Sequence, residues 1–202
     1  AVTNPTPFIE SLSQRHILRD SSTFILSIFG TNFIPETTVE FVINPLEPPN
    51  VKQVTYYSPT ELRVEIPASD LTKTGMFAIV VKNPGPGGGT AGRQFNVINP
   101  VPTTTNINPN TILAGAGSDS EPGEENTFVD VYGTNFTPDE TVVLWDGDLR
   151  PTEYISSTHL RVTLSVTDLL YTGTHEITVE NEPLIQISLD IFEGVDFGGE
   201  EP

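Results

Sequence analysis

Apolar and polar residues alternate over several short stretches of the chain. In one of them, Leu62, Val64 and Ile66 alternate with Arg63 and Glu65. A period of two places successive side chains on opposite faces of a β-strand, so that one face is buried and the other meets solvent. The same alternation recurs at residues 26–28 and 39–41. The pattern therefore predicts a fold of half-buried antiparallel strands.

The pattern occurs twice along the chain. The segment ILSIFGTNFIPETTVEF at residues 25–41 aligns with FVDVYGTNFTPDETVVL at residues 128–144, and residues 58–83 align with residues 156–181. Internal similarity of this kind is the signature of a repeated structural unit. Each unit has the length of one small sandwich domain.

The junction between the two units lies at VINPVP, residues 97–102. Pro100 and Pro102 restrict the backbone there, so we expect a short, semi-rigid linker. We predict a first domain over residues 1–99, with a short N-terminal extension, and a second over residues 100–202, with an acidic C-terminal tail.

The alignment predicts equivalent buried positions in the two units. In the first unit they are Leu26, Ile28, Phe33, Val39, Phe41, Leu62, Val64, Ile79 and Val81. In the second unit they are Val129, Val131, Phe136, Val142, Leu144, Leu160, Val162, Ile177 and Val179. His175 aligns with Phe77, so we expect it to be partly buried and not catalytic. We find no helical period, and we predict only one short helical turn each in ASDLTKTG (68–75) and VTDLLYTG (166–173).

The composition supports strands rather than helices. Val, Ile and Thr are abundant, and their branching at Cβ disfavours helices and suits pleated strands. The 18 Pro and 16 Gly provide frequent turns. With 36% hydrophobic residues the chain has enough apolar material for a folded core. The predicted fold class is all-β.

Short motifs within this pattern resemble a known domain family. Gly30-Thr31-Asn32-Phe33 recurs as Gly133-Thr134-Asn135-Phe136, and the first unit adds SPTELRVEIPA, the loop NPGPGGG and a closing FNV. Together these motifs resemble the IPT/TIG family over about residues 7–98 and 103–192. The resemblance implies two tandem immunoglobulin-like antiparallel β-sandwiches. Because the second unit lacks the glycine-rich loop, its last two strands must be connected differently.

The resemblance leaves the function open, because fold and function separate in this class of domain. Family members occur in DNA-binding factors, receptor ectodomains, starch-acting enzymes and bacterial surface proteins, mostly as spacers or interaction modules. The DNA-binding members use basic loops, whereas the loops here carry acids such as Glu36, Asp139 and Glu140. The style of the sequence, rich in Thr and poor in Lys, resembles bacterial secreted members. The expected location is therefore extracellular or on the cell surface.

Charge and hydropathy narrow the possible partners. The 9 Lys and Arg against 27 Asp and Glu give a formal net charge of −18, which repels nucleic acid and anionic lipid. No apolar run approaches the ~20 residues that a membrane helix needs, so we expect no membrane insertion. The chain has no Cys, which removes disulfides and thiolate chemistry.

Candidate chemistry is sparse. The three His lack a paired nucleophile motif, so we predict no enzyme, no catalytic residue and no cofactor. A weak Ca²⁺ candidate is the acidic loop that carries Asp119, Glu121, Glu124 and Glu125. That loop lacks the ligand spacing of a known calcium loop, so a solvated acidic loop is the main interpretation. Trp145 and Tyr132 are weak candidates for a sugar-stacking or protein-contact surface.

The leading hypothesis is a structural building block of the bacterial cell surface or extracellular matrix. Such a subunit polymerises head to tail into a fibre by terminal strand exchange, because heterologous contacts propagate. The predicted interface residues are Val2, Phe8, Ile9, Ile191, Phe192, Val195 and Phe197. The alternatives are an adhesin or spacer module that binds other surface proteins or a glycan, and an accessory domain of a polysaccharide-acting enzyme.

Overall fold

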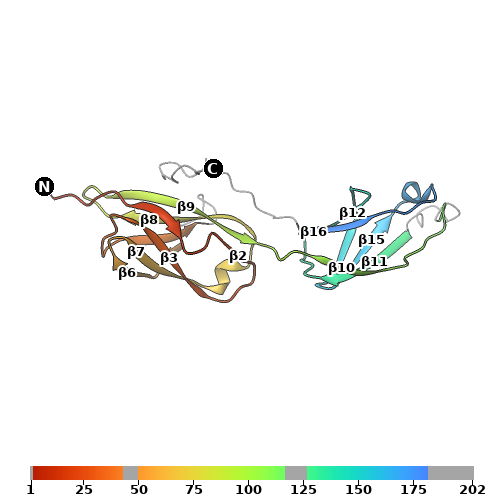
Figure 1. Cartoon of the computed structure of the whole chain (residues 1–202), viewed down its shortest axis with the longest axis horizontal. Coiled ribbons are helices and arrows are strands. Elements are labelled where there is room, and N and C mark those ends of the chain that lie inside the picture. The colour runs from red at the N-terminus through yellow and green to blue at the C-terminus, as the bar shows by residue number, and fades with distance from the viewer. Residues whose placement is uncertain (1, 43–49, 117–126, 182–202) are drawn as a thin grey trace. The chain divides into compact units, whose positions relative to one another are not determined.

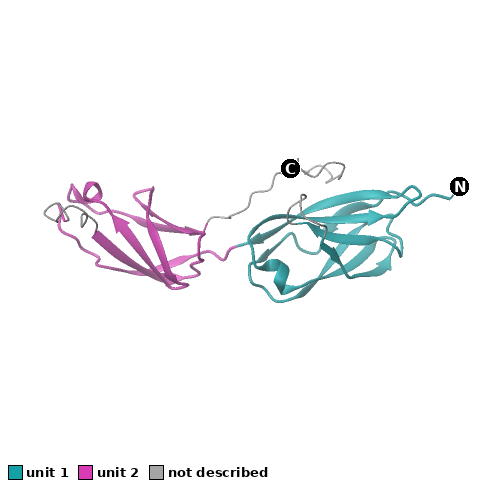
Figure 2. Ribbon diagram, turned by 180° about the vertical axis from the view of Figure 1, so that it is seen from behind, with its two compact units in different colours: residues 1–98, 183–202 teal, residues 99–182 magenta. Residues whose placement is uncertain are grey.

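The computed structural model describes residues 2–42, 50–116 and 127–181 (Figure 1). These residues form two compact units, which divide between Ile98 and Asn99 (Figure 2). Each unit is a sandwich of two β-sheets, and the described residues contain no α-helix. The all-β sandwich class predicted from the sequence is confirmed.

Unit 1 consists of a four-stranded and a five-stranded sheet. The first has the order β1 (Phe8–Leu12), β3 (Phe24–Thr31), β7 (Glu61–Ile66) and β6 (Val54–Ser58). The second has the order β2 (His16–Leu18), β9 (Gly89–Ile98), β8 (Gly75–Asn83), β4 (Thr38–Val42) and β5 (Asn50–Lys52). Neighbouring strands are antiparallel except β2 and β9, which are parallel. The chain therefore begins in one sheet with β1 and crosses to the other with β2.

The core of unit 1 lies between these sheets and contains every residue predicted for it. The predicted residues Leu26, Ile28, Phe33, Val39, Phe41, Leu62, Val64, Ile79 and Val81 are all buried. At its centre Phe41 stacks on Phe77, with ring centroids 5.1 Å apart, and the edge of Phe95 meets Phe41 at 6.0 Å. Stacked and edge-to-face contacts of this kind add to the gain from burial.

The described strands of unit 2 follow the order of unit 1. One sheet has the order β10 (Thr103–Asn108), β11 (Thr127–Thr134), β15 (His159–Leu164) and β14 (Thr152–Ser156). The other has the order β13 (Asp148–Arg150), β12 (Thr141–Trp145) and β16 (Ile177–Asn181). The short helices η1 (Ala68–Leu71) and η2 (Val166–Leu169) lie in the two segments predicted to form one helical turn each.

Strand β12 contradicts the predicted core of unit 2. Val142 and Leu144, predicted to be buried, are only half-buried, whereas Val143 between them is fully buried. Val143 pairs with Val179 in the way that Val39 pairs with Val81 in unit 1. The predicted register is wrong by one residue, and a shift of one residue exchanges the two faces of a strand.

The turn before β12 explains this shift. In unit 1 the amide of Thr37 donates to the carbonyl of Ile34, three residues earlier, at 2.9 Å. In unit 2 the amide of Thr141 donates to the carbonyl of Thr137, four residues earlier, at 3.2 Å. The longer turn accommodates its extra residue with Asp139 in the left-handed region, at a φ of 64°. An alignment without a gap therefore misplaces the following strand.

Ile177 and Val179 on β16 are also less buried than predicted. Both are half-buried and pack against the core of unit 2, while their equivalents Ile79 and Val81 are fully buried. The difference follows from the neighbouring strand. In unit 1, β9 pairs with β8 along its whole length, whereas β16 pairs with β12 alone among the described residues.

Candidate functional site

Strand β9 has two partners in unit 1 and defines a strand position that can be compared between the units. It pairs antiparallel with β8 from Gly75 to Asn83, and its C-terminal end pairs parallel with β2. Its side chains Phe95 and Val97 are buried against the core. A strand in this position therefore closes one side of the sandwich and holds the crossing segment β2 in place.

The backbone that flanks this position recurs in unit 2. Gly115 donates from its amide to the carbonyl of Leu169 at 2.7 Å, as Asp20 does to Leu71 in unit 1 at 2.9 Å. These matching bonds make residues 111–113 the counterpart of β2. Within the part of the chain that the structure describes, no strand lies between residues 111–113 and β16.

A cavity of about 400 Å³ lies at this position in unit 2. Ile112 and Leu113 line it, together with His175 and Ile177. Trp145 also lines it, in the place that Phe41 holds in unit 1. The cavity therefore corresponds to the space that Phe95 and Val97 fill in unit 1.

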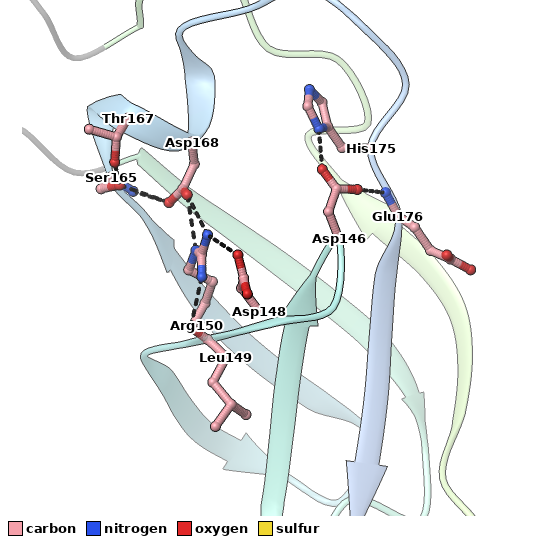
Figure 3. A network of polar contacts seen from close by, with 9 residues as sticks. All are labelled: Asp146, Asp148, Leu149, Arg150, Ser165, Thr167, Asp168, His175 and Glu176. Carbon is pink, nitrogen blue, oxygen red and sulfur yellow. Dashed lines mark hydrogen bonds and ion pairs between the residues drawn. The ribbon is translucent and has the colours of Figure 1, made fainter.

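Trp145 and His175 stack on each other at the cavity, with ring centroids 4.7 Å apart and planes at 20°. Asp146 bonds to His175 and to the next residue, Glu176, as Figure 3 shows. Its Oδ2 lies 2.6 Å from Nδ1 of His175, and its Oδ1 accepts the amide of Glu176 at 2.8 Å. His175 is half-buried, as the alignment predicts.

These contacts shift both pKa values in the direction of an ion pair. The hydrogen bond to Asp146 raises the pKa of His175 above its ordinary value of 6.5. The hydrogen bond from His175, together with the amide of Glu176, lowers the pKa of Asp146. Asp146 and Gly147 form the two-residue turn between β12 and β13, with positive φ values of 51° and 89°.

A second ion pair anchors η2 near the cavity. Arg150 donates to Oδ1 of Asp168 from Nη2 at 2.6 Å and from Nε at 3.0 Å (Figure 3). Burial raises the pKa of Asp168, but hydrogen bonds from Arg150 and Ser165 together outweigh burial and lower it. Lys52 and Asp70 form the equivalent pair in unit 1. Because both units carry this pair, we assign it a structural role.

The candidate aromatic residues do not form one platform. Trp145 packs against the core of unit 2, whereas Tyr132 stacks on His159, with ring centroids 4.6 Å apart. His159 also lies 3.0 Å from Asp130, whose pKa is lowered by hydrogen bonds from Arg161 and from His159. The sequence identified both aromatic residues but missed the imidazole that stacks on each.

The residues predicted for the subunit interface have different environments. Val2 and Phe8 are exposed, whereas Ile9 is 2% exposed in the core of unit 1 and does not contribute to a surface. The remaining interface candidates, Ile191, Phe192, Val195 and Phe197, lie outside the described residues. So do the Ca²⁺ candidates Asp119, Glu121, Glu124 and Glu125.

The N-terminal segment is held by the glycine-rich loop of its own unit. Asn4 donates from its amide to the carbonyl of Pro86 at 2.8 Å and accepts the amide of Gly88 at 2.7 Å. Gly87, at a φ of 75°, lies so close that an added Cβ would be 2.6 Å from the carbonyl oxygen of Asn4. The motif NPGPGGG predicts a loop but not its contact with Asn4, because backbone hydrogen bonds leave no side-chain signal.

Two other kinds of feature are absent from the described residues. Among them, no group of three His, Cys, Asp or Glu is placed to hold a metal ion. No helix within the described ranges has the length and apolar character to cross a membrane.

One protein-family model matches a segment in the second half of the chain. The IPT/TIG domain model matches residues 102–192. An IPT/TIG domain is therefore present in unit 2. This domain includes all strands from β10 to β16 and continues to residue 192. The sequence motifs had suggested the closer resemblance in unit 1.

Solved structures similar to the chain are distant in sequence. The solution structure of the TIG domain from human nuclear factor of activated T-cells, cytoplasmic 4, is 17% identical, covers 46% of this chain and 89% of its own, and has a TM-score of 0.37. The structure of the plexin A4 extracellular region is 16% identical to this chain and has a TM-score of 0.34. The match covers 82% of this chain and 13% of the plexin chain. The structure of murine CEACAM1b is 14% identical to this chain and has a TM-score of 0.35. The match covers 92% of this chain and 100% of the CEACAM1b chain. No curated protein sequence matches the chain.

Proposed function

We propose that this chain is a structural building block of the cell exterior that associates head to tail by exchanging a terminal strand. In this proposal both units are IPT/TIG domains that act as interaction modules rather than enzymes. Their shared strand order and shared ion pair support the assignment of unit 1 to the same family.

One observation carries the proposal. The edge of β16 presents backbone donors and acceptors that pair with no described strand, beside a cavity of about 400 Å³ whose lining includes the apolar side chains of Ile112, Trp145 and Ile177. A strand from a second copy satisfies a whole row of these groups at once and buries its apolar side chains in the cavity. Since donor and acceptor surfaces differ, each added copy presents a new acceptor, and the contact propagates.

The contacts of the N-terminus indicate which end of the chain is the donor. Asn4 and Thr6 bind the glycine-rich loop of unit 1, and Asn83 donates to the carbonyl of Pro5 at 2.8 Å. A segment held in this way is not available for exchange. The C-terminal segment is therefore the donor in this proposal.

The environments of the histidines support a non-catalytic role. His159 and His175 each stack on an aromatic ring and lie within 3.0 Å of a carboxylate. Among the described residues, neither imidazole forms a hydrogen bond with a Ser or Thr hydroxyl that would act as a nucleophile. Their arrangement is that of structural side chains that tie neighbouring strands together.

Cysteine cross-linking between two different variants tests strand exchange directly, because the chain contains no native Cys. Thr178 lies on the exposed face of β16, so Thr178→Cys in one preparation is mixed with Ser188→Cys, or with Gln186→Cys, in another. Each chain carries one thiol, and a mixed disulfide requires strand donation between chains.

We expect disulfide-linked heterodimers after the two preparations are denatured, mixed, refolded and mildly oxidised, and filaments of the unmodified protein in negative-stain micrographs. The control mixes Thr178→Cys with Thr55→Cys, a residue of β6 in unit 1, and gives no enrichment. A monomer at all concentrations, with no mixed disulfide, overturns the proposal and favours the spacer or adhesin function.

A further inference from the structure

The strand position beside β16 imposes a specific pattern on whatever occupies it. In unit 1, the residues opposite Phe77 and Gly75 are Phe95 and Val97, and both are buried. The equivalents of Phe77 and Gly75 in unit 2 are His175 and Gly173, and both line the cavity. An occupant antiparallel to β16 must therefore carry apolar side chains at alternate positions.

Exposed apolar side chains at the cavity indicate that its occupant must also pair with residues 111–113. Leu113 is 82% exposed and Tyr171 is 80% exposed, and both line the cavity. Leu18, the equivalent of Leu113 in unit 1, is 49% exposed beside β9. A strand that pairs with residues 111–113, as β9 pairs with β2, reduces the exposure of Leu113.

One segment of the chain meets this pattern. Residues 185–191 read IQISLDI, in which Ile185, Ile187, Leu189 and Ile191 alternate with Gln186, Ser188 and Asp190. Four consecutive alternate positions are aliphatic, and the positions between them are polar. The match to the IPT/TIG domain extends to residue 192 and so includes this segment.

Other terminal segments fit less well. Residues 193–202, EGVDFGGEEP, contain only two large apolar residues and four acids. Residues 4–6 are bound to the glycine-rich loop of unit 1. The segment 185–191 is thus the occupant that the sequence and the cavity favour together.

We infer that residues 185–191 fill the cavity of unit 2, antiparallel to β16 and parallel to residues 111–113, with the four odd-numbered aliphatic side chains inward. This inference rests on the proposed function in one respect, namely that a second copy donates the segment. If the segment pairs with β16 in a register shifted by two residues, the same four side chains still point inward, because a shift of two residues keeps every side chain on its face.

Trp145 is a built-in reporter, because it lines the cavity and is the single Trp of the chain. We expect Ile187→Glu and Leu189→Glu in the full chain to shift the emission of Trp145 to the red and to increase its quenching by acrylamide. The matched controls Gln186→Glu and Ser188→Glu add the same charge on the outer face and leave both readouts unchanged. Equal effects of the two sets, or no effect of the inward set, overturn the inference.

A peptide rescue covers the case in which the inward variants fold poorly. A synthetic peptide of residues 183–192 is added to the Leu189→Glu variant during refolding, and we expect it to restore the blue-shifted emission of Trp145. The same peptide with glutamate at positions 187 and 189 restores nothing. Failure of the native peptide to shift the emission, or an equal shift by the glutamate peptide, contradicts the inference.

The two proposals fail separately. If the inward variants expose Trp145 while the full chain stays monomeric, the segment fills the cavity of its own chain, and only the proposed function is wrong. If the chain assembles with the mixed disulfide but inward and outward variants behave alike, another part of the C-terminal segment occupies the cavity, and only the inference about residues 185–191 is wrong.

Discussion

Trp145 stacks on His175 in the place where unit 1 stacks Phe41 on Phe77. The two pairs occupy equivalent positions on neighbouring strands, and their ring centroids are 4.7 Å and 5.1 Å apart. Unit 2 has thus exchanged an apolar pair for one that carries an ionisable group. Asp146 fixes the orientation of that group at the edge of the cavity.

This exchange predicts a pH dependence for the stability of unit 2. The hydrogen bond to Asp146 raises the pKa of His175 in the folded state. The stabilisation is therefore fully present below the unfolded pKa of about 6.5 and is lost as the pH rises through the folded pKa. We expect the midpoint of thermal unfolding, followed by Trp145 fluorescence, to fall as the pH is raised from weakly acidic to alkaline values.

His175→Phe is the matched variant for this prediction, because it restores the aromatic pair of unit 1 without the titrating group. It is expected to flatten the pH profile in this range. The control His16→Gln changes an exposed histidine of unit 1 and leaves the profile as it is. A His175→Phe protein with the full pH dependence contradicts the assignment to this pair.

The buried amide of Asn83 predicts a large loss of stability on truncation. Asn83 is 2% exposed, donates to the carbonyls of Pro5 and Asn32, and accepts from Thr37. Asn83→Ala leaves buried partners unsatisfied, at a cost of about 1–3 kcal/mol or more. Urea unfolding measures this loss, and the exposed control Asn110→Ala is expected to change stability by less than about 0.5 kcal/mol.

Gly87 predicts a local effect at the N-terminus. A Cβ at this position would meet the backbone of Asn4 at 2.6 Å, and the φ of 75° disfavours other residues. We expect Gly87→Ala to release residues 2–6, seen as faster hydrogen exchange at the amide of Asn4. Gly85→Ala is the control, because a Cβ there meets nothing within 4 Å. Unchanged exchange in Gly87→Ala would show that the loop does not hold the segment.

The ion pair of Lys52 and Asp70 predicts that the stability losses of two mutations are not additive. The two side chains are 7% and 11% exposed. Lys52→Met alone leaves an unpaired, largely buried carboxylate and is expected to cost about 3–5 kcal/mol. The double variant Lys52→Met, Asp70→Leu is expected to cost less, because no charge stays buried. A double-mutant cycle by urea unfolding measures the coupling, and additive costs would contradict it.

The sequence predicts the parts of this fold that depend on side-chain pattern. All nine predicted core residues of unit 1 are buried, because a period of two is a direct consequence of strand geometry. The short helices fall where they were expected, at residues 68–71 and 166–169. In unit 2 the pattern fails at β12, because Val142, Val143 and Leu144 are all apolar and give no sign of which face is buried.

The candidate site depends on features that the sequence does not show. The stack of Trp145 on His175 follows only once the register of β12 is corrected, since the alignment without a gap pairs Trp145 with Val42. The clamp on Asn4 combines a side-chain bond to the carbonyl of Pro84 with two backbone hydrogen bonds, and any residue type can make the backbone bonds. The cavity results from the arrangement of two loops, the short helix η2 and four strands, and no local motif encodes it.

The longer turn between Thr137 and Thr141 has a consequence for how related domains diverge. Because it rotates the next strand by one position, Val142 and Leu144 face outward, where an ungapped copy would have buried them. Two domains on one scaffold can therefore acquire different exteriors while their interiors stay alike. Between such copies, a single inserted residue changes which side chains of the next strand reach the surface, and an ungapped comparison of aligned positions overlooks it.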